Sequence, residues 1–132
     1  MVEVEKVVVV HDTLYVQQIA EIEEHYNAAE FIKGKADLSD EVKIALHDLG
    51  KVMQQNPDLR LRLEGHTSAD GDDAFNQKLS EDRAKAAVDF LVEHEGIDSG
   101  RLDFIGKGAS ELKNAEDPSA IENCRTEFVI IE

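Results

Sequence analysis

The chain has 132 residues and a formal net charge of -15 at pH 7, and its hydrophobic and charged fractions are 42% and 33%. This length fits one domain that buries its own core. The negative charge argues against nucleic-acid binding by phosphate neutralisation and against attraction to anionic lipid. Cys124 is the only cysteine, which rules out an intrachain disulfide and argues against a cysteine-based metal site.

The N-terminal residues 1–16 are rich in valine and in other β-branched or aromatic residues, which predicts one or two strands. A strand of this kind needs a partner. Pairing within the domain and pairing between chains, which would give a homo-oligomer, both remain open. No basic start leads into an apolar core, so the segment is not a signal peptide, and no apolar run approaches the roughly 20 residues of a membrane span. If the protein is exported, we expect that its targeting signal has been removed and that this chain is a fragment.

Residues 17–30 fit two structures, and both remain open. A short strand is one of them, over residues 28–32. A helix is the other, because three residues have helical spacing: Ile19, Ile22 and Tyr26. We place the start of the main domain at residue 28, within this stretch, with an N-terminal strand or linker segment over residues 1–27 and the domain over residues 28–132.

The next segment predicts a helix with a defined start and end. Ser39 is a good N-cap, and the acidic pair Asp40-Glu41 follows in the first turn, where the helix dipole favours anions. Asn56-Pro57 ends the helix. Six residues at helical spacing form its apolar stripe: Val42, Ala45, Leu46, Leu49, Val52 and Met53.

A strand is predicted over residues 59–64, where leucines alternate with charged residues. We expect the leucines to face the core and the charges to face solvent, because successive side chains of a strand point to opposite faces. Further strands are predicted at residues 102–105 and 126–131, and Gly106-Lys107-Gly108 stops the first of these two. Residues 118–123 fit a short helical turn.

A second helix follows a loop bracketed by two glycines, with Asp72 or Asp73 as its N-cap and Gly96 just beyond its end. Its expected buried stripe comprises Phe75, Leu79, Ala86, Phe90 and Leu91. From residue 28 the order is therefore strand, helix, strand, helix, strand, loop, strand. Strands separated by helical crossovers predict an α+β domain with partly parallel pairing and both helices stacked against the sheet.

The loop at residues 66–71 and the helix after it predict a seat for a carboxylate. Asn76 and Arg83 are seven residues apart, so they lie within about 20° around the helix and about 10.5 Å along it, with Ser80 between them. Arg83 borders the predicted stripe, where its guanidinium would be partly desolvated, and its forked donors suit a carboxylate. The free N–H groups of the helix start also favour an anion. The alternative is that Arg83 only pairs with a nearby acid: Glu64, Asp70 or Asp82.

A longer pattern connects these residues along most of the chain. It comprises Glu64-Gly65-His66-Thr67, Gly71, Asn76, Leu79-Ser80, Arg83-Ala84, Gly96-Ile97, Arg101-Leu102, Gly106-Lys107-Gly108 and Asn123-Cys124-Arg125-Thr126-Glu127-Phe128. This pattern resembles the core of OmpA-like domains over roughly residues 28–131. The resemblance implies a β-α-β-α-β-β two-layer sandwich, with helices packed on one face of a mixed parallel and antiparallel sheet.

The resemblance also implies a function. OmpA-like domains are non-catalytic modules that bind peptidoglycan, so we expect this chain to anchor an outer-membrane protein to the cell wall by gripping diaminopimelate in the stem peptide. Arg83 matches the family's arginine, which takes the diaminopimelate carboxylate, and Thr67 and Asn76 would be polar groups of the pocket. The expected location is the periplasmic face of the outer membrane, without direct membrane contact by this part of the chain, and without a cofactor or a metal.

Two departures from the family pattern bear on this function. Ser68 replaces the loop aspartate that faces the amino group of diaminopimelate, and losing that charge-assisted contact would weaken binding by about 1–3 kcal/mol. Asp70 is a candidate substitute. Cys124 replaces the first arginine of the closing motif, while Arg125 remains as a secondary contact. These departures motivate the alternative of an OmpA-like domain that has lost wall binding and acts as a protein-interaction or spacer domain.

A third hypothesis is a metal-assisted hydrolase that uses His66 and Asp70. Against it, no second histidine or cysteine lies near His66 in the sequence, and a histidine at the end of a strand is more often held by a local hydrogen bond. The run from Asp70 to Asp73 imitates the start of a calcium loop. The match fails, because Phe75 stands where such a loop requires glycine and Ala74 stands at a ligand position.

Overall fold

The computed structural model describes residues 13–28, 38–69, 71–118 and 123–131. Its helices are α1 (Thr13–Ala28), α2 (Asp40–Gln55), α3 (Asp73–Glu93) and the short 3-10 helix η2 (Ser99–Arg101). Its strands are β2 (Arg60–His66), β3 (Leu102–Gly106) and β4 (Arg125–Ile131). None of the helices in this part of the chain is both long enough and apolar enough to cross a membrane.

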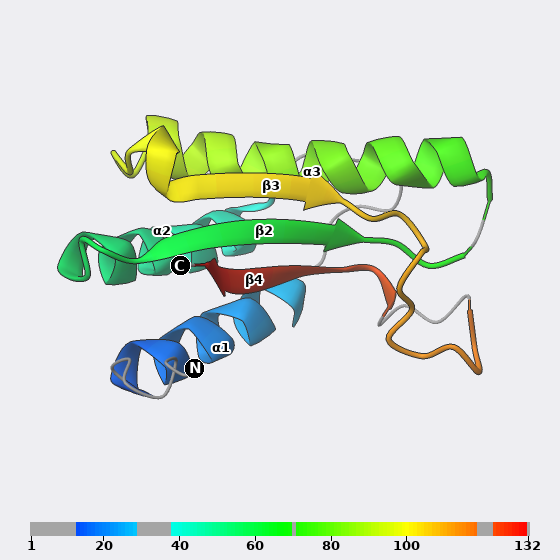
Figure 1. Cartoon of the computed structure of the whole chain (residues 1–132), viewed down its shortest axis with the longest axis horizontal. Helices are drawn as coiled ribbons and strands as arrows, with labels where there is room; N and C mark the ends of the chain where they lie inside the picture. The colour runs from blue at the N-terminus through cyan, green and yellow to red at the C-terminus, as the bar shows by residue number, and fades with distance from the viewer. Residues whose placement is uncertain (1–12, 29–37, 70, 119–122, 132) are drawn as a thin grey trace.

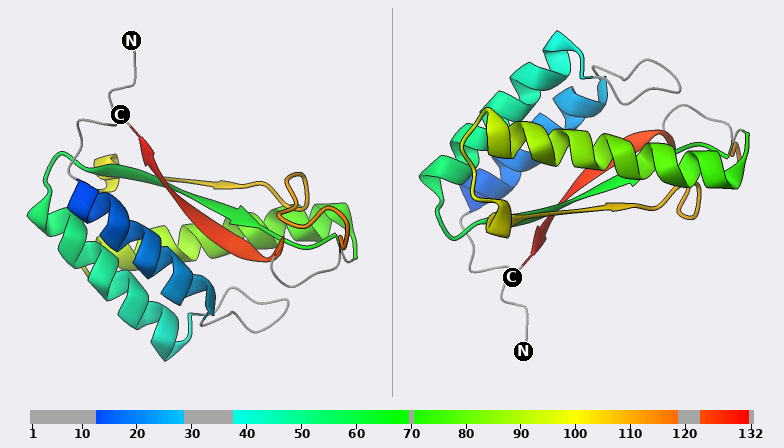
Figure 2. Two further views of the ribbon diagram at one scale, coloured as in Figure 1. Left: turned by 90° about the horizontal axis from the view of Figure 1, so that it is seen from below. Right: turned by 90° about the horizontal axis from the view of Figure 1, so that it is seen from above.

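β2 is the central strand of the described sheet, whose order is β3-β2-β4. It runs parallel to β3, which it reaches through α3, and antiparallel to β4. The long helices lie behind the sheet in Figure 1, so one face is covered and the other, which we call the open face, is not. Figure 2 shows the same arrangement from two further sides. The predicted α+β fold, with helices on one face of a mixed sheet, is confirmed.

α1 differs from its prediction at its start. Residues 14–16 belong to this helix, so the strand predicted there is wrong, and residues 1–12 lie outside the described part of the chain. The helical alternative for residues 17–28 is confirmed, because Ile19, Ile22 and Tyr26 are buried on one face, where α1 packs on α2 and β4. This tertiary burial outweighs the local β-propensity. The strand predicted at residues 28–32 falls almost entirely outside the described residues, as does most of the turn at 118–123.

The two helices that flank β2 begin at predicted caps. The Ser39 hydroxyl accepts a hydrogen bond from the Val42 N–H at 3.2 Å, and the Asp72 carboxylate accepts one from the Phe75 N–H at 3.1 Å. α2 ends at Asn56, as predicted, and every residue of its predicted stripe is buried. The local signals of α2 therefore agree with its packing in the core.

The burial of the β2 side chains agrees with the prediction for the leucines and contradicts it for one charged residue. Leu61 and Leu63 are fully buried beneath the helices, as expected. The expectation that the charges face solvent is wrong for Glu64, which is only 5% exposed although it lies on the open face. The segment after β3 covers this end of the sheet, and Lys107 Nζ lies 3.3 Å from Glu64 Oε1. The charge is buried because a distant segment supplies a partner, which strand alternation does not reveal.

α3 turns a different face to the sheet than the sequence predicts. Phe75 is 53% exposed, and three more members of the predicted stripe are only partly buried: Leu79, Ala86 and Phe90. Leu91 is the one member that is buried. The buried residues of the helix are mostly small or polar, namely Asn76, Ser80, Arg83, Ala84, Ala87, Val88 and Leu91.

The physical reason is a close approach between α3 and the sheet at two glycines. A Cβ atom on Gly65 would collide with the carbonyl oxygen of Ser80, and one on Gly106 would collide with the backbone N of Glu81. Only small side chains fit between backbones this close, so α3 presents small residues to the sheet and leaves its first phenylalanine exposed. The same rotation turns Arg83 into the interior.

Candidate functional site

Arg83 is a buried cation, with 7% of its surface exposed. It interacts with Tyr26 of α1 and with Cys124, which precedes β4. Burial lowers the pKa of Arg83, and the interactions with Cys124 and Tyr26 act in the opposite direction. Because an arginine keeps its charge in proteins, this position holds a desolvated guanidinium, whose forked geometry matches a carboxylate.

The loop after β2 reaches the neighbourhood of this arginine through Ser68. The Ser68 N–H donates to Cys124 Sγ at 3.3 Å, and its carbonyl accepts from Asn76 Nδ2 at 3.4 Å. Asn76 is itself buried on the same helix as Arg83. The structure therefore brings together Ser68, Asn76, Arg83 and Cys124, which we call the Arg83 cluster.

Thr67 is adjacent to this cluster in the chain and is almost fully buried. Its N–H donates to the Gly108 carbonyl at 2.8 Å, but its hydroxyl has no hydrogen-bond partner among the described residues. A buried hydroxyl without a partner costs about 1–3 kcal/mol, and a ligand or an ordered water would satisfy it. Ser80 differs, because its hydroxyl accepts from the Gly108 N–H and donates to the Gln77 carbonyl, each at 2.9 Å.

The remaining predicted site residues lie elsewhere. Asp70 is outside the described part of the chain. Arg125 pairs with His66 in the β2–β4 register, and its guanidinium donates to Glu127 at 2.8 Å and to the Glu111 carbonyl at 3.2 Å. Residues that are directly opposite in a sheet share a face, so Arg125 lies on the open face and is not brought into the Arg83 cluster.

The alternative that Arg83 merely pairs with a neighbouring acid loses two of its three candidates. Glu64 is held by Arg62 at 2.9 Å and by Lys107 at 3.3 Å, while Asp82 pairs with a lysine one turn earlier on α3 at 3.1 Å. Burial would raise the pKa of Glu64, but the hydrogen bonds from Arg62 and Lys107 outweigh it and lower that pKa. Both acids are therefore committed to other cations.

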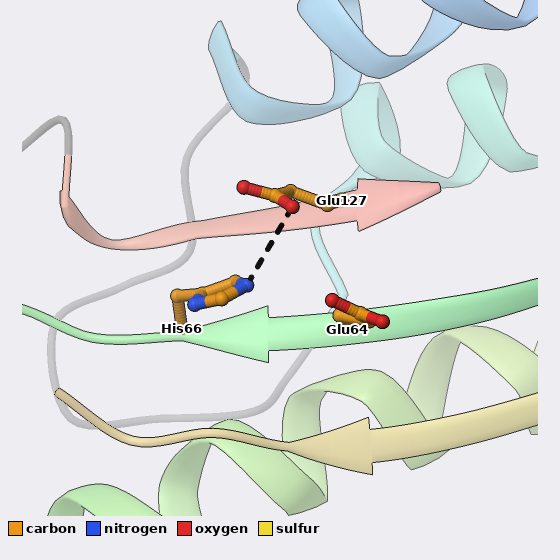
Figure 3. A group of neighbouring side chains, drawn as sticks. All are labelled: Glu64, His66 and Glu127. Atoms are coloured by element: carbon orange, nitrogen blue, oxygen red, sulfur yellow. Dashed lines mark ion pairs between the residues drawn. The ribbon is translucent and has the colours of Figure 1, made fainter. Parts of the chain in front are cut away.

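A second polar group lies on the open face and comprises Glu64, His66 and Glu127 (Figure 3). One potential ligand atom from each residue lies within 4.8 Å of the others. His66 ends β2 as predicted, but the expected local hydrogen bond is wrong, because neither ring nitrogen has a hydrogen-bond partner within the described ranges. Burial and the charge of Arg125 lower the pKa of His66, against the opposing effect of nearby carboxylates. The ring is therefore neutral at neutral pH, the form that binds a metal.

Sequence reasoning missed Tyr26 and Glu127 as members of these two groups. Tyr26 reaches Arg83 from α1, and Glu127 reaches His66 only through the antiparallel register of β2 and β4. Neither approach follows from the spacing of residues along the chain. The one available signal was that Glu127 belongs to the closing motif of the family pattern, which also contains Cys124.

Known proteins share this architecture. The family model described as OmpA family matches residues 30–125. Over 65 residues the chain is 45% identical to outer membrane porin F of Pseudomonas aeruginosa, which covers 49% of this chain and 19% of the porin. The chain thus spans about a fifth of the length of that relative.

Two solved structures show the same fold. The peptidoglycan-associated lipoprotein from Burkholderia pseudomallei superimposes with a TM-score of 0.67 at 18% identity, covering 80% of this chain and 93% of that chain. The cell wall anchor of the T6SS from Pseudomonas aeruginosa superimposes with a TM-score of 0.62 at 25% identity, covering 77% and 75%. Because the family model extends over most of the residues, from just after α1 to the first residue of β4, the chain belongs to the OmpA family.

Proposed function

We propose that this domain anchors a protein of the cell envelope to the cell wall by binding the diaminopimelate residue of the peptidoglycan stem peptide. The relatives support this proposal, since they include an outer membrane porin, a peptidoglycan-associated lipoprotein and a cell wall anchor. The observation that carries it is the desolvated guanidinium of Arg83, at the family's position for the carboxylate-binding arginine. The domain would act by binding, without catalysis, on the periplasmic side of the outer membrane.

In the proposed complex, the Arg83 guanidinium takes one carboxylate of diaminopimelate. Its burial strengthens the contact, because a charge-assisted hydrogen bond is stronger where water does not compete. The Thr67 hydroxyl, which lacks a hydrogen-bond partner among the described residues, would gain one from a polar group of the ligand. Asn76 fixes the loop by donating to the Ser68 carbonyl.

The amino group of the ligand would meet a weaker partner than in the family pattern. The Ser68 hydroxyl accepts a hydrogen bond from an ammonium but brings no charge, and Asp70 is the nearest acid in the loop sequence. The missing charge corresponds to about 1–3 kcal/mol of affinity. Arg125 is left out of this contact set, because its side chain is engaged on the open face.

The direct test is calorimetric titration of a diaminopimelate-containing stem peptide into the wild-type domain and into an Arg83→Ala variant. Arg60→Ala is the matched control, because it removes an exposed arginine from β2. We expect the first substitution to weaken binding strongly and the second to leave it unchanged. No binding by the wild type, or equal binding by both variants, would overturn the proposal.

The second candidate is a spacer or protein-interaction domain that no longer binds the wall. Ser68, Cys124 and the net charge of -15 favour it, since peptidoglycan offers no strong positive partner to so acidic a domain. Co-sedimentation with purified sacculi separates the two candidates. Retention that resists moderate salt supports wall binding, whereas recovery of the domain in the supernatant supports the spacer.

A further inference from the structure

The Glu64–His66–Glu127 group is assembled by the pairing of β2 with β4. Glu64 lies directly opposite Glu127, and His66 lies directly opposite Arg125. Because Leu61 and Leu63 point into the core, the alternate residues Glu64 and His66 point to the open face. Figure 3 shows the side chains of the group rising from the two strands on the same side of the sheet.

The imidazole of His66 is the unusual member of this group. His66 is 1% exposed, and neither Nδ1 nor Nε2 has a hydrogen-bond partner among the described residues. Nε2 points toward Glu127, and it lies 3.8 Å from Oε1, which is beyond hydrogen-bond reach. Buried polar atoms normally have a partner, so Nε2 faces a position where a bound atom would supply the partner that it lacks.

The carboxylates leave one oxygen facing that position. Arg125 binds Oε2 of Glu127 at 2.8 Å, so Oε1 of Glu127 is the atom that faces the imidazole. The two oxygens of Glu64 contact Arg62 and Lys107. Two carboxylates placed directly across a strand pair repel each other, and these cations offset the repulsion.

We propose that Glu64, His66 and Glu127 form a binding site for Zn²⁺. One imidazole nitrogen and two carboxylate oxygens are a ligand set that zinc takes, with a fourth position left for water. Oxygen-only ions such as Ca²⁺ and Mg²⁺ fit a histidine-containing site poorly. Ligand atoms around a tetrahedral zinc lie about 3.4 Å apart, given bonds of about 2.1 Å, so the present spacing of up to 4.8 Å needs only side-chain adjustment.

Lys107 is the group that a bound zinc would displace. Its side chain is 25% exposed, and it contacts Glu111 at 3.1 Å as well as Glu64 at 3.3 Å. Lys107 can therefore leave Glu64 while it keeps its contact with Glu111. Removing the lysine charge should therefore strengthen zinc binding at this site. The same change would not affect a zinc ion bound elsewhere.

The proposed zinc site is independent of peptide binding. The Glu64–His66–Glu127 group lies on the open face, while the Arg83 cluster lies on the side of the helices. Zinc at this place would join β2 to β4, and β4 directly follows the segment that carries Cys124. The expected role of the ion is to stabilise this pair of strands.

The test is calorimetric titration of the whole chain with zinc chloride, together with thermal unfolding in the presence and absence of zinc. We expect one zinc ion per chain and a higher melting temperature with the ion. Co²⁺ in its place should give the visible absorption bands of a tetrahedral site. Glu127→Gln keeps the shape of a partly exposed side chain and should lower zinc affinity roughly tenfold or more, with an unchanged circular dichroism spectrum.

Two further variants keep the proposal falsifiable. Lys107→Gln should raise zinc affinity several-fold. His47→Gln is the matched control, because the exposed His47 lies 2.9 Å from a carboxylate oxygen of Glu95 and so offers zinc a second histidine–carboxylate pair. Absence of stoichiometric binding, an unchanged zinc affinity of Glu127→Gln, or binding that disappears in His47→Gln would each overturn the proposal.

Discussion

The two polar groups of this domain lie on opposite faces of one sheet and have opposite charge. The Arg83 cluster presents a desolvated cation among a thiol, an amide and a loop, covered by helices. The Glu64–His66–Glu127 group presents two carboxylates and a neutral imidazole on the open face. The first suits an anion and the second suits a cation, and β2 contributes to the second while the loop that follows it contributes to the first. β2 thus lies between a group suited to an anion and a group suited to a cation.

The largest expected effect comes from breaking the contact that positions both groups. Gly65→Ala places a methyl group against the Ser80 backbone of α3, so we expect a loss of about 3 kcal/mol in the free energy of unfolding, measured by urea denaturation. Gly100→Ala is the control, because the nearest atom to its added methyl is a side-chain oxygen at 3.3 Å. Equal stability of the two variants would show that the α3–β2 contact is less tight than described.

The next largest effects are expected when each polar group is mutated in turn and the binding of both ligands is measured. Arg83→Ala should weaken stem-peptide binding by about 2 kcal/mol, roughly thirtyfold, because a charge-assisted contact is lost. Its zinc affinity should not change. Glu127→Gln should show the reverse pattern in the same two calorimetric titrations. If either substitution weakens the binding of both ligands, the two groups are energetically coupled and are not independent sites.

A smaller effect on stem-peptide binding is expected at Ser68, which belongs to the Arg83 cluster. Ser68→Asp restores the charge that the family pattern has in this loop, so we expect stem-peptide binding to tighten by about 1.4 kcal/mol, or roughly tenfold. Ser99→Asp adds the same charge at an exposed position of η2 and serves as the control in the titration. Unchanged or weaker binding by Ser68→Asp would mean that this loop does not face the ligand's amino group.

The smallest effect concerns the thiol that links loop and helix. Cys124→Ala removes the acceptor for the Ser68 N–H and should lower the free energy of unfolding by about 1 kcal/mol. Cys124→Ser keeps an acceptor, so its loss should be smaller. Urea denaturation of both variants checks this order, and equal losses would show that the hydrogen bond contributes nothing measurable.

The sequence predicted the fold best where the signals were local. α2 has its cap, its stripe and its end within one segment, and the structure agrees at each point. The buried face of α3 was predicted wrongly, because most of the residues on that face are small or polar rather than large and apolar. Its rotation depends on Gly65 and Gly106, which bring the helix so close to the sheet that Phe75 is left outside.

The candidate sites were predictable to different degrees for a similar reason. Asn76 and Arg83 share one helix, so their common face followed from helical geometry. The partners Tyr26 and Glu127 come from α1 and β4, and only tertiary packing and strand register bring them to Arg83 and His66. Long-range pairing of this kind leaves no trace in the spacing of residues.

A matched pair of ligands tests whether the Arg83 cluster binds a carboxylate of diaminopimelate. Diaminopimelate differs from lysine by one additional carboxylate beside the distal amino group. We expect a stem peptide with diaminopimelate to bind the wild-type domain at least roughly tenfold more tightly than the same peptide with lysine, and we expect Arg83→Ala to abolish this preference. Equal affinity of the wild type for the two peptides would contradict it.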